Sequence, residues 1–165
     1  MTVTTTSPKF VSFSLLLYAL LGWAVCSSFV QGAPAAADPR YIDEGYPIPT
    51  KSYCDQPYVV ITKDGNWLCV LTTGSGHEGS GGQHFVSTIS KDKGKTWGPL
   101  VDIEPGTGPE ASYGSPLIVP SGRVYAFYTY NGDRISTLPG SDKKIRADML
   151  GWYCFRYSDD NGQSW

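Results

Sequence analysis

The chain lacks an excess of charge of either sign. Its 165 residues include 13 lysines and arginines and 15 aspartates and glutamates, which gives a net charge of −2. Nucleic acids and anionic membrane surfaces are bound by basic patches, and this balance does not supply one. We therefore expect no nucleic-acid partner; we also expect no stable insertion into a membrane once the signal segment described below has been cleaved.

Histidine and cysteine are also scarce. The two histidines, His77 and His84, flank Glu78 and make a metal site conceivable, but the chain has no H-E-x-x-H pair and no C-x-x-C pair. We therefore expect no metal and no cofactor. Cys54 and Cys69 bracket an expected hairpin and could form a disulfide in an oxidising compartment. Buried free thiols are an equally good interpretation.

The first 37 residues follow the pattern of a secretory signal peptide. Lys9 is their only charge, and it precedes an apolar stretch from about Phe10 to Val30; small residues then follow up to Asp38. Such a pattern predicts export and cleavage, so we expect a secreted, periplasmic or extracellular protein with the mature part 38–165. An uncleaved single-span anchor is the alternative, because the apolar stretch is nearly long enough to cross a bilayer.

Long helical patterns are missing after residue 37, whereas turn-forming residues are plentiful. The sequence has 19 glycines and 12 prolines, and they separate short runs of β-branched and aromatic residues. This arrangement predicts an all-β domain. The expected strands are 57–61, 67–72, 83–90, about 99–103, 116–119, 123–130 and 151–157. Loops are expected at 74–82, 104–115 and 131–146.

One eight-residue pattern, S-x-D-x-G-x-[ST]-W, occurs twice. Its residues are Ser90, Asp92, Gly94, Thr96 and Trp97 in the first copy, and Ser158, Asp160, Gly162, Ser164 and Trp165 in the second. The serine and the aspartate can accept backbone hydrogen bonds, the glycine suits positive φ, and the tryptophan re-enters the sheet as an apolar anchor. Each copy therefore predicts a hairpin turn. In the first, we expect Asp92 to accept backbone hydrogen bonds and Trp97 to be buried.

The repeated motif resembles the Asp box, or BNR repeat, of the sialidase (neuraminidase) superfamily. In that family the motif closes hairpins of a six-bladed β-propeller, on its periphery and away from the active site. The resemblance implies that residues 38–165 form the first blade and most of a second. Because the family's pocket is assembled from all the blades, it also implies that this part alone is inactive and marginally folded or aggregating.

The resemblance further implies an exo-glycosidase that removes a terminal sialic acid or a related sugar from a glycan. The family's first carboxylate-binding arginine falls in the run Asp55-Gln56-Pro57, where an aspartate replaces it. Glu78, on the glycine-rich loop 74–82, matches the position of the family's acid/base; a solvated loop carboxylate is the alternative interpretation. The residues expected to contact substrate are Asp55, Gln56, His77, Gln83, His84, Glu110 and Tyr113.

A second class of function is compatible with the same residues, namely a non-catalytic Asp-box propeller that binds glycans or proteins. Asp boxes are structural, so they argue for a fold more than for a chemistry. The family's tyrosine nucleophile, the glutamate that activates it and its later arginines belong to blades that we expect downstream. Finding those residues there would favour the enzyme, and their absence would favour the binding module.

Overall fold

The computed structural model describes residue 38 and residues 40–165. The expected signal segment, residues 1–37, lies outside the described residues. The chain divides into two units, Met1–Glu44 and Gly45–Trp165. In the described part of the first unit, the regular structure is a short 3₁₀ turn, η1 (Ile42–Glu44). No helix in the described part of the chain is long and apolar enough to cross a membrane.

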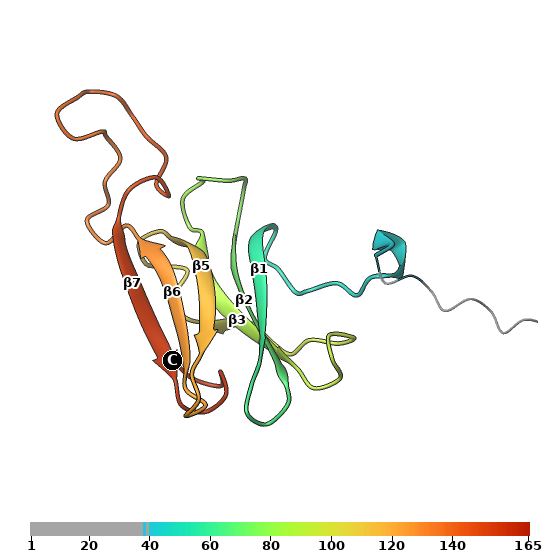
Figure 1. The fold of residues 1–165 in the computed structure, drawn as a ribbon. Coiled ribbons are helices and arrows are strands. Elements are labelled where there is room, and N and C mark those ends of the chain that lie inside the picture. Colours follow the sequence, from blue (N-terminus) through green and yellow to red (C-terminus); the bar gives the residue numbers. More distant parts are fainter. Residues whose placement is uncertain (1–37, 39) are drawn as a thin grey trace, which may run out of the picture. The chain divides into compact units, whose positions relative to one another are not determined.

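The second unit is built from two antiparallel sheets, with strand orders β1-β2-β3-β4 and β5-β6-β7 (Figure 1). The strands are β1 (Tyr53–Ile61), β2 (Trp67–Gly74), β3 (His84–Ser90), β4 (Val101–Asp102), β5 (Ala111–Ile118), β6 (Val124–Tyr130) and β7 (Trp152–Ser158). Residues 40–165 contain no α-helix. The predicted all-β class is therefore confirmed.

Two predicted strand boundaries were wrong for the same reason. β1 begins at Tyr53 rather than at residue 57, and β5 begins at Ala111, inside the predicted loop 104–115. Both strands contain an irregular register, with Gln56 at φ 47° and Tyr113 at φ 54°. A bulge of this kind interrupts the alternation of inward and outward side chains. The first residues of these strands therefore do not continue the alternation of polar and apolar residues by which a strand is recognised in a sequence.

The two sheets repeat one backbone plan. Trp67 of β2 pairs with Ser90 of β3, and Val124 of β6 pairs in the same way with Ser158 of β7. A residue of β1 or β2 therefore corresponds to the residue 57 positions later in β5 or β6. A residue of β3 or of the turn after it corresponds to the residue 68 positions later in β7 or its turn. The difference falls between the second and third strands, where the β6–β7 loop is longer than the β2–β3 loop. The bulges of β1 and β5 lie at matching places in this structural repeat.

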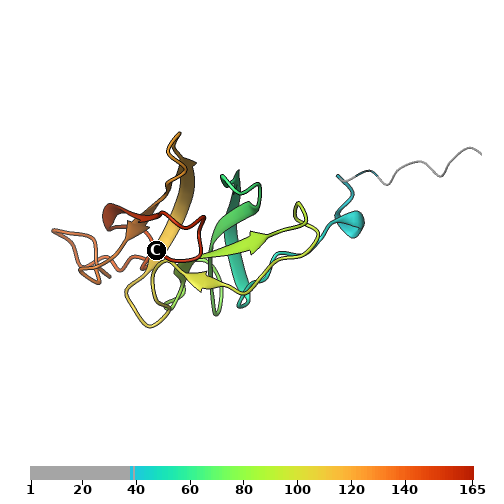
Figure 2. The ribbon, with the colours of Figure 1, turned by 90° about the horizontal axis from the view of Figure 1, so that it is seen from below.

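The main core lies between the two sheets. It consists of Val70, Phe85, Ile103, Ala111, Ala126 and Tyr128, none more than 3% exposed. The rings of Phe85 and Tyr128 have centroids 5.3 Å apart and join the sheets. β5 contacts β1, β2 and β3, so the first strand of the second sheet lies across the face of the first sheet (Figure 2). Burial of these side chains is the main force holding the sheets together.

The two repeated motifs form turns with matching hydrogen bonds. In the first turn, Ser90 Oγ accepts from the Gly94 N–H at 2.7 Å, and Asp92 Oδ1 accepts from the Thr96 N–H at 2.8 Å. The corresponding distances in the second turn are 2.8 and 2.9 Å. The Thr96 hydroxyl also donates to Asp92, and these bonds lower the pKa of Asp92 to about 2. The predicted turn is confirmed, except that Trp97 is half-buried rather than buried.

Of the two interpretations left open for Cys54 and Cys69, the structure has free thiols rather than a disulfide, and of the two only Cys69 is buried. Cys54 lies opposite Thr73, and Cys69 lies opposite Val59, so the strand register keeps the two thiols from pairing. Both cysteines are free. Cys69 is buried in the sheet, whereas Cys54 is exposed.

The packing of Phe85 against Gly114 gives a direct test of the contact between the sheets. A Cβ atom at position 114 would lie 2.0 Å from Phe85 Cζ. We expect Gly114→Ala to lower the free energy of unfolding by about 1–3 kcal/mol, as overpacked cores do. Denaturant unfolding measures this change. Gly81→Ala is the control, because a Cβ at position 81 meets no atom within 4 Å. Equal stability of the two variants would contradict this packing.

Candidate functional site

Polar side chains from separate segments meet at one end of the second unit. The β2–β3 loop and the β6–β7 loop leave the sheets at this end (Figure 1). The segment before β5 arrives there, and β1 begins there opposite Gly74. The two repeated turns lie at the opposite ends of the same strands, because Ser90 and Ser158 pair with Trp67 and Val124. We call the polar group the rim cluster; its members are Tyr53, Asp55, Glu78, Glu110, Tyr113, Arg146 and Asp148.

Arg146, on the β6–β7 loop, is the centre of the rim cluster. Its Nε donates to Asp148 Oδ1 at 3.0 Å, and its Nη2 lies 3.1 Å from Asp148 Oδ2. The same Nη2 lies 3.1 Å from Glu78 Oε1 on the β2–β3 loop. Its stem packs on Gly79, where a Cβ would lie 2.6 Å from Arg146 Cδ. A single guanidinium therefore connects the loops of the two sheets.

Tyr113 enters the cluster from the bulge of β5. Its hydroxyl donates to Asp148 Oδ2 at 2.5 Å and accepts from Arg146 Nη2 at 3.2 Å; Glu78 Oε1 lies 3.4 Å away. Burial, and then the hydrogen bond with Asp148, raise the pKa of Tyr113 well above its usual range. Tyr113 therefore acts as a neutral hydrogen-bonding group. The positive charge of Arg146 lowers its pKa by less than burial and Asp148 raise it.

Asp55 and Tyr53 extend the cluster along β1. Burial, and then the negative charges of Asp55 and Glu78, raise the pKa of Tyr53 to about 12. Asp148 contributes a smaller effect in the same direction. The cluster therefore holds four carboxyl groups and one guanidinium. This excess of acidic groups repels a negatively charged ligand and favours a neutral or positively charged one.

Glu110 is the buried member of the cluster. Its side chain is 7% exposed, and neither carboxyl oxygen has a hydrogen-bond partner among the described residues. Burial, and then the negative charge of Asp148, raise its pKa to about 7. Glu110 therefore keeps its proton up to a pH near neutrality, because an ionised carboxylate is costly to bury without partners.

Gln83 and His77 shape the β2–β3 loop rather than its polar surface. Gln83 is buried; its Nε2 donates to the His77 carbonyl at 2.6 Å, and its Oε1 accepts from the Gly79 N–H at 3.3 Å. The His77 ring is exposed and lies near the Ser80 hydroxyl. These bonds fix the loop that presents Glu78. A direct contact with substrate stays a prediction for both residues.

His84 belongs to a different group of side chains. It is 2% exposed, and its Nε2 accepts from Lys51 Nζ at 2.9 Å and lies 3.4 Å from Asp102 Oδ1. It sits beside Gly106, where a Cβ would lie 3.0 Å from the ring. No member of the rim cluster hydrogen-bonds to His84 in residues 40–165. Gln56 lies in the bulge of β1, and it too has no hydrogen bond to the rim cluster in the described chain.

The structure thus unites four of the predicted site residues and adds others. Glu78, Asp55, Glu110 and Tyr113 lie in the rim cluster, as grouped by their hydrogen bonds and mutual charge effects. Sequence reasoning found neither Asp148 nor Arg146, which lie in or just after the predicted loop 131–146. The only sequence signal was the Arg146-x-Asp148 spacing. No group of three or more potential metal ligands occurs among the residues that the structure describes.

Comparison with known proteins identifies the fold only. No family model matches the chain, and no curated protein matches it. A crystal structure of a protein of unknown function from Dyadobacter fermentans is similar, with a TM-score of 0.51 and 17% sequence identity. The match covers 73% of this chain and 36% of that chain, so this chain spans about a third of that protein. At this identity the similarity concerns the all-β fold and carries no activity with it.

The raised pKa of Glu110 predicts a pH dependence of stability. Its folded-state pKa of about 7 lies above the ordinary value of 4.5, so this group stabilises the fold most at low pH. The free energy of unfolding should fall by about 2 kcal/mol as the pH rises from about 4.5 to about 7. Glu110→Gln should abolish this part of the slope. Urea unfolding across that range measures it.

The control for this experiment is Glu44→Gln, which changes an exposed carboxylate. It should keep the slope of the unchanged protein. If Glu110→Gln and the unchanged protein show parallel curves between pH 4.5 and 7, the buried carboxyl group is not protonated as described.

Proposed function

We propose that this chain is part of a secreted glycoside hydrolase of the sialidase type, which removes a terminal sugar from a glycan. The observation that carries the proposal is the rim cluster. Loops of the two sheets and the bulge of β5 bring Glu78, Tyr113, Arg146 and Asp148 within hydrogen-bonding distance. Such convergence of acid and hydrogen-bonding groups at the loop end of a rigid scaffold suits catalysis or binding.

The repeat supports the propeller part of the proposal. Two sheets with the same register, bulge position and closing turn pack face to face, as successive blades of a propeller do. The turns lie away from the rim cluster, as the Asp boxes of sialidases lie away from the active site. Further blades of the same plan would enclose the rim cluster, which is open here: Glu78 and Arg146 side chains are 50% and 44% exposed.

In this proposal Glu78 is the general acid. It is the most accessible carboxylate bound by Arg146, so it can reach the glycosidic oxygen of a bound sugar. The Glu78 carboxyl group gives its proton to that oxygen while the bond between this oxygen and the anomeric carbon breaks. Water then adds its hydroxyl group to the anomeric carbon, and its remaining proton returns to Glu78. Arg146 and Tyr113 position Glu78, and Glu110 is a buried group beneath the site.

The charge of the cluster favours a sugar without a carboxylate. Resemblance to sialidases makes sialic acid the default substrate. However, Asp55 replaces the family's arginine, and three further carboxyl groups lie in the cluster. Arg146 is already bound to Asp148 and Glu78. A substrate carboxylate would meet repulsion without a free guanidinium to pair with, so a neutral terminal sugar fits better.

Hydrolysis of fluorogenic glycosides by the full-length natural protein tests this function. We expect turnover of at least one neutral glycoside, and we expect Glu78→Gln to lower kcat by about 10²–10⁴-fold, the usual effect of losing a general acid. Stability should change little, because the Glu78 side chain is half exposed. The matched control is Asp142→Asn, an exposed carboxylate on the β6–β7 loop. Unchanged turnover after Glu78→Gln would exclude Glu78 as the acid.

The alternative is a glycan- or protein-binding propeller without catalysis. One observation favours it: Glu78 is held in an ion pair with Arg146, a contact that suits a fixed binding surface. Saturable binding of a glycan, weakened by Arg146→Gln and accompanied by no hydrolysis of any glycoside tested, would support this alternative against the enzyme.

A further inference from the structure

Two buried amide side chains lie at the bases of the loops that carry the rim cluster. Gln83 is 2% exposed and Asn131 is 3% exposed. Gln83 is the last residue of the β2–β3 loop, and Asn131 is the first residue of the β6–β7 loop. A side-chain amide both donates and accepts hydrogen bonds, so a single one can bind a carbonyl and an N–H group of the same loop.

The Gln83 amide holds the backbone on both sides of Glu78. Its Nε2 donates to the His77 carbonyl at 2.6 Å, and its Oε1 accepts from the Gly79 N–H at 3.3 Å. Glu78 lies between these two residues in the chain. The place from which its side chain departs is therefore set by Gln83.

The Asn131 amide does the same for Arg146. Its Nδ2 donates to the Ala147 carbonyl at 2.9 Å, and its Oδ1 accepts from the Ile135 N–H at 2.8 Å. Ala147 lies between Arg146 and Asp148 in the chain. One buried side chain at the start of a long loop thus holds the loop's far end, where the guanidinium and its carboxylate partner are attached.

The two amides lie on the two sides of the contact between the loops. Arg146 Nη2 and Glu78 Oε1 are 3.1 Å apart, and both side chains are about half exposed. An ion pair in contact with water contributes little to holding its own geometry, because water solvates both charges and two flexible side chains must be ordered. The contact therefore depends on the fixed backbones that Gln83 and Asn131 provide.

We propose that Gln83 and Asn131 are the positioning residues of the rim cluster. Together they hold the two loops so that Arg146 meets Glu78, and they act on a substrate only through these two side chains. Their effect on turnover rests on the proposed function. Their effect on the position of Arg146 does not, so the two parts are tested separately.

The position of Arg146 is tested by modification of arginine side chains with phenylglyoxal in the full-length natural protein, read by peptide mass spectrometry. Gln83→Ala and Asn131→Ala should each speed modification of Arg146 by about tenfold, because lost hydrogen bonds shift local opening equilibria by about this factor. Arg134, exposed on the same loop, is the internal reference and should react at an unchanged rate.

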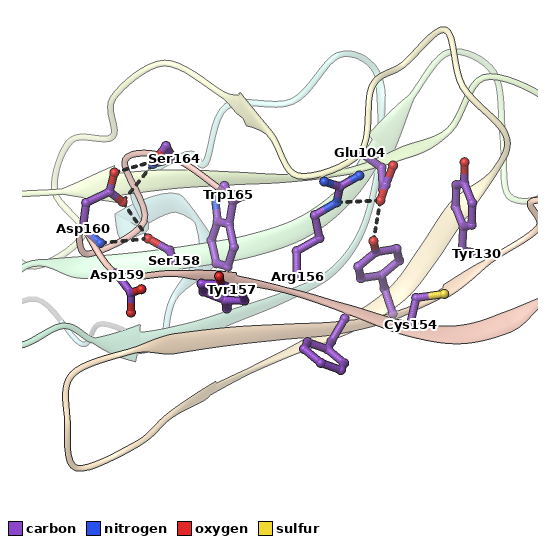
Figure 3. A pocket seen from close by; sticks show the side chains of 12 residues that line it. Glu104, Tyr130, Cys154, Arg156, Tyr157, Ser158, Asp159, Asp160, Ser164 and Trp165 are labelled. Atoms are coloured by element: carbon purple, nitrogen blue, oxygen red, sulfur yellow. Dashed lines mark hydrogen bonds and ion pairs between the residues drawn. The ribbon is translucent and has the colours of Figure 1, made fainter.

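The matched control removes a polar contact between the sheets at another place. Arg156 Nε donates to the buried Glu104 at 2.9 Å (Figure 3), and neither side chain hydrogen-bonds to the rim cluster in residues 40–165. Arg156→Gln should lower stability, because Glu104 loses a partner, and should leave the modification rate of Arg146 unchanged. An equal acceleration by Arg156→Gln, or none by either amide variant, would overturn the proposal.

Amide hydrogen exchange in the unchanged protein gives a measurement that needs no variant to fold. The Gly79 and Ile135 N–H groups donate to the two buried amides, whereas Gly140 lies at the exposed tip of the β6–β7 loop. We expect both N–H groups to exchange at least about tenfold more slowly than that of Gly140. Exchange of either at the rate of Gly140 would show that its amide does not hold the loop, and would overturn the proposal.

Turnover of a neutral glycoside by the full-length protein tests the effect on catalysis. Asn131→Ala should lower kcat by about 10–100-fold with little change in KM, the usual effect of a misplaced catalytic group. In an Arg146→Gln background it should add little, because it acts through Arg146; an undiminished effect there would overturn this part. If the unchanged protein hydrolyses no glycoside, the proposed function fails, and the modification of Arg146 still decides the positioning role.

Discussion

The contact of Phe85 with Gly114 and Tyr128 determines how the rest of the second unit is arranged. Phe85 belongs to β3 of the first sheet, and its ring lies on the backbone of β5 and beside Tyr128 of β6. Aromatic rings bury a large apolar area and prefer tilted geometries of this kind. Because this contact fixes one sheet against the other, it also fixes the loops at their ends. Glu78 and Arg146 belong to different sheets, and they meet only if the sheets pack in this way.

The bulge of β5 connects that packing to the rim cluster. Gly114 lacks a side chain and lets Phe85 approach the strand, while its neighbour Tyr113, at φ 54°, points its hydroxyl at Asp148. A positive φ is costly for a tyrosine and persists where surrounding contacts hold it. Here the contacts are the hydrogen bonds to Asp148 and Arg146 on one side and the packed glycine on the other. The structure of the core and the geometry of the cluster therefore share two adjacent residues.

The parts that the sequence predicted are those governed by local interactions. The turn at 90–97 is built from hydrogen bonds between residues no more than four apart, so its motif is sufficient to predict it. The strands β2, β3, β6 and β7 followed from apolar runs between glycines. The starts of β1 and β5 were missed because bulges break the pattern. The partnership of Arg146 with Glu78 joins residues 68 positions apart, and no local pattern in a long polar loop encodes such a contact.

The difference between the two copies of the repeat explains why one end of the unit is rich in polar chemistry. Gln56 and Tyr113 occupy equivalent bulges, yet only Tyr113 has a long loop on its own sheet that returns Asp148 to its hydroxyl. The first sheet has the shorter loop, which supplies Glu78 across the interface instead. The repeated backbone thus places a side chain at each of two equivalent bulges. The lengths of the loops then determine which of the two side chains has hydrogen-bond partners. The scaffold is fixed by repetition and core packing, whereas the chemistry depends on the positions at which the two copies differ.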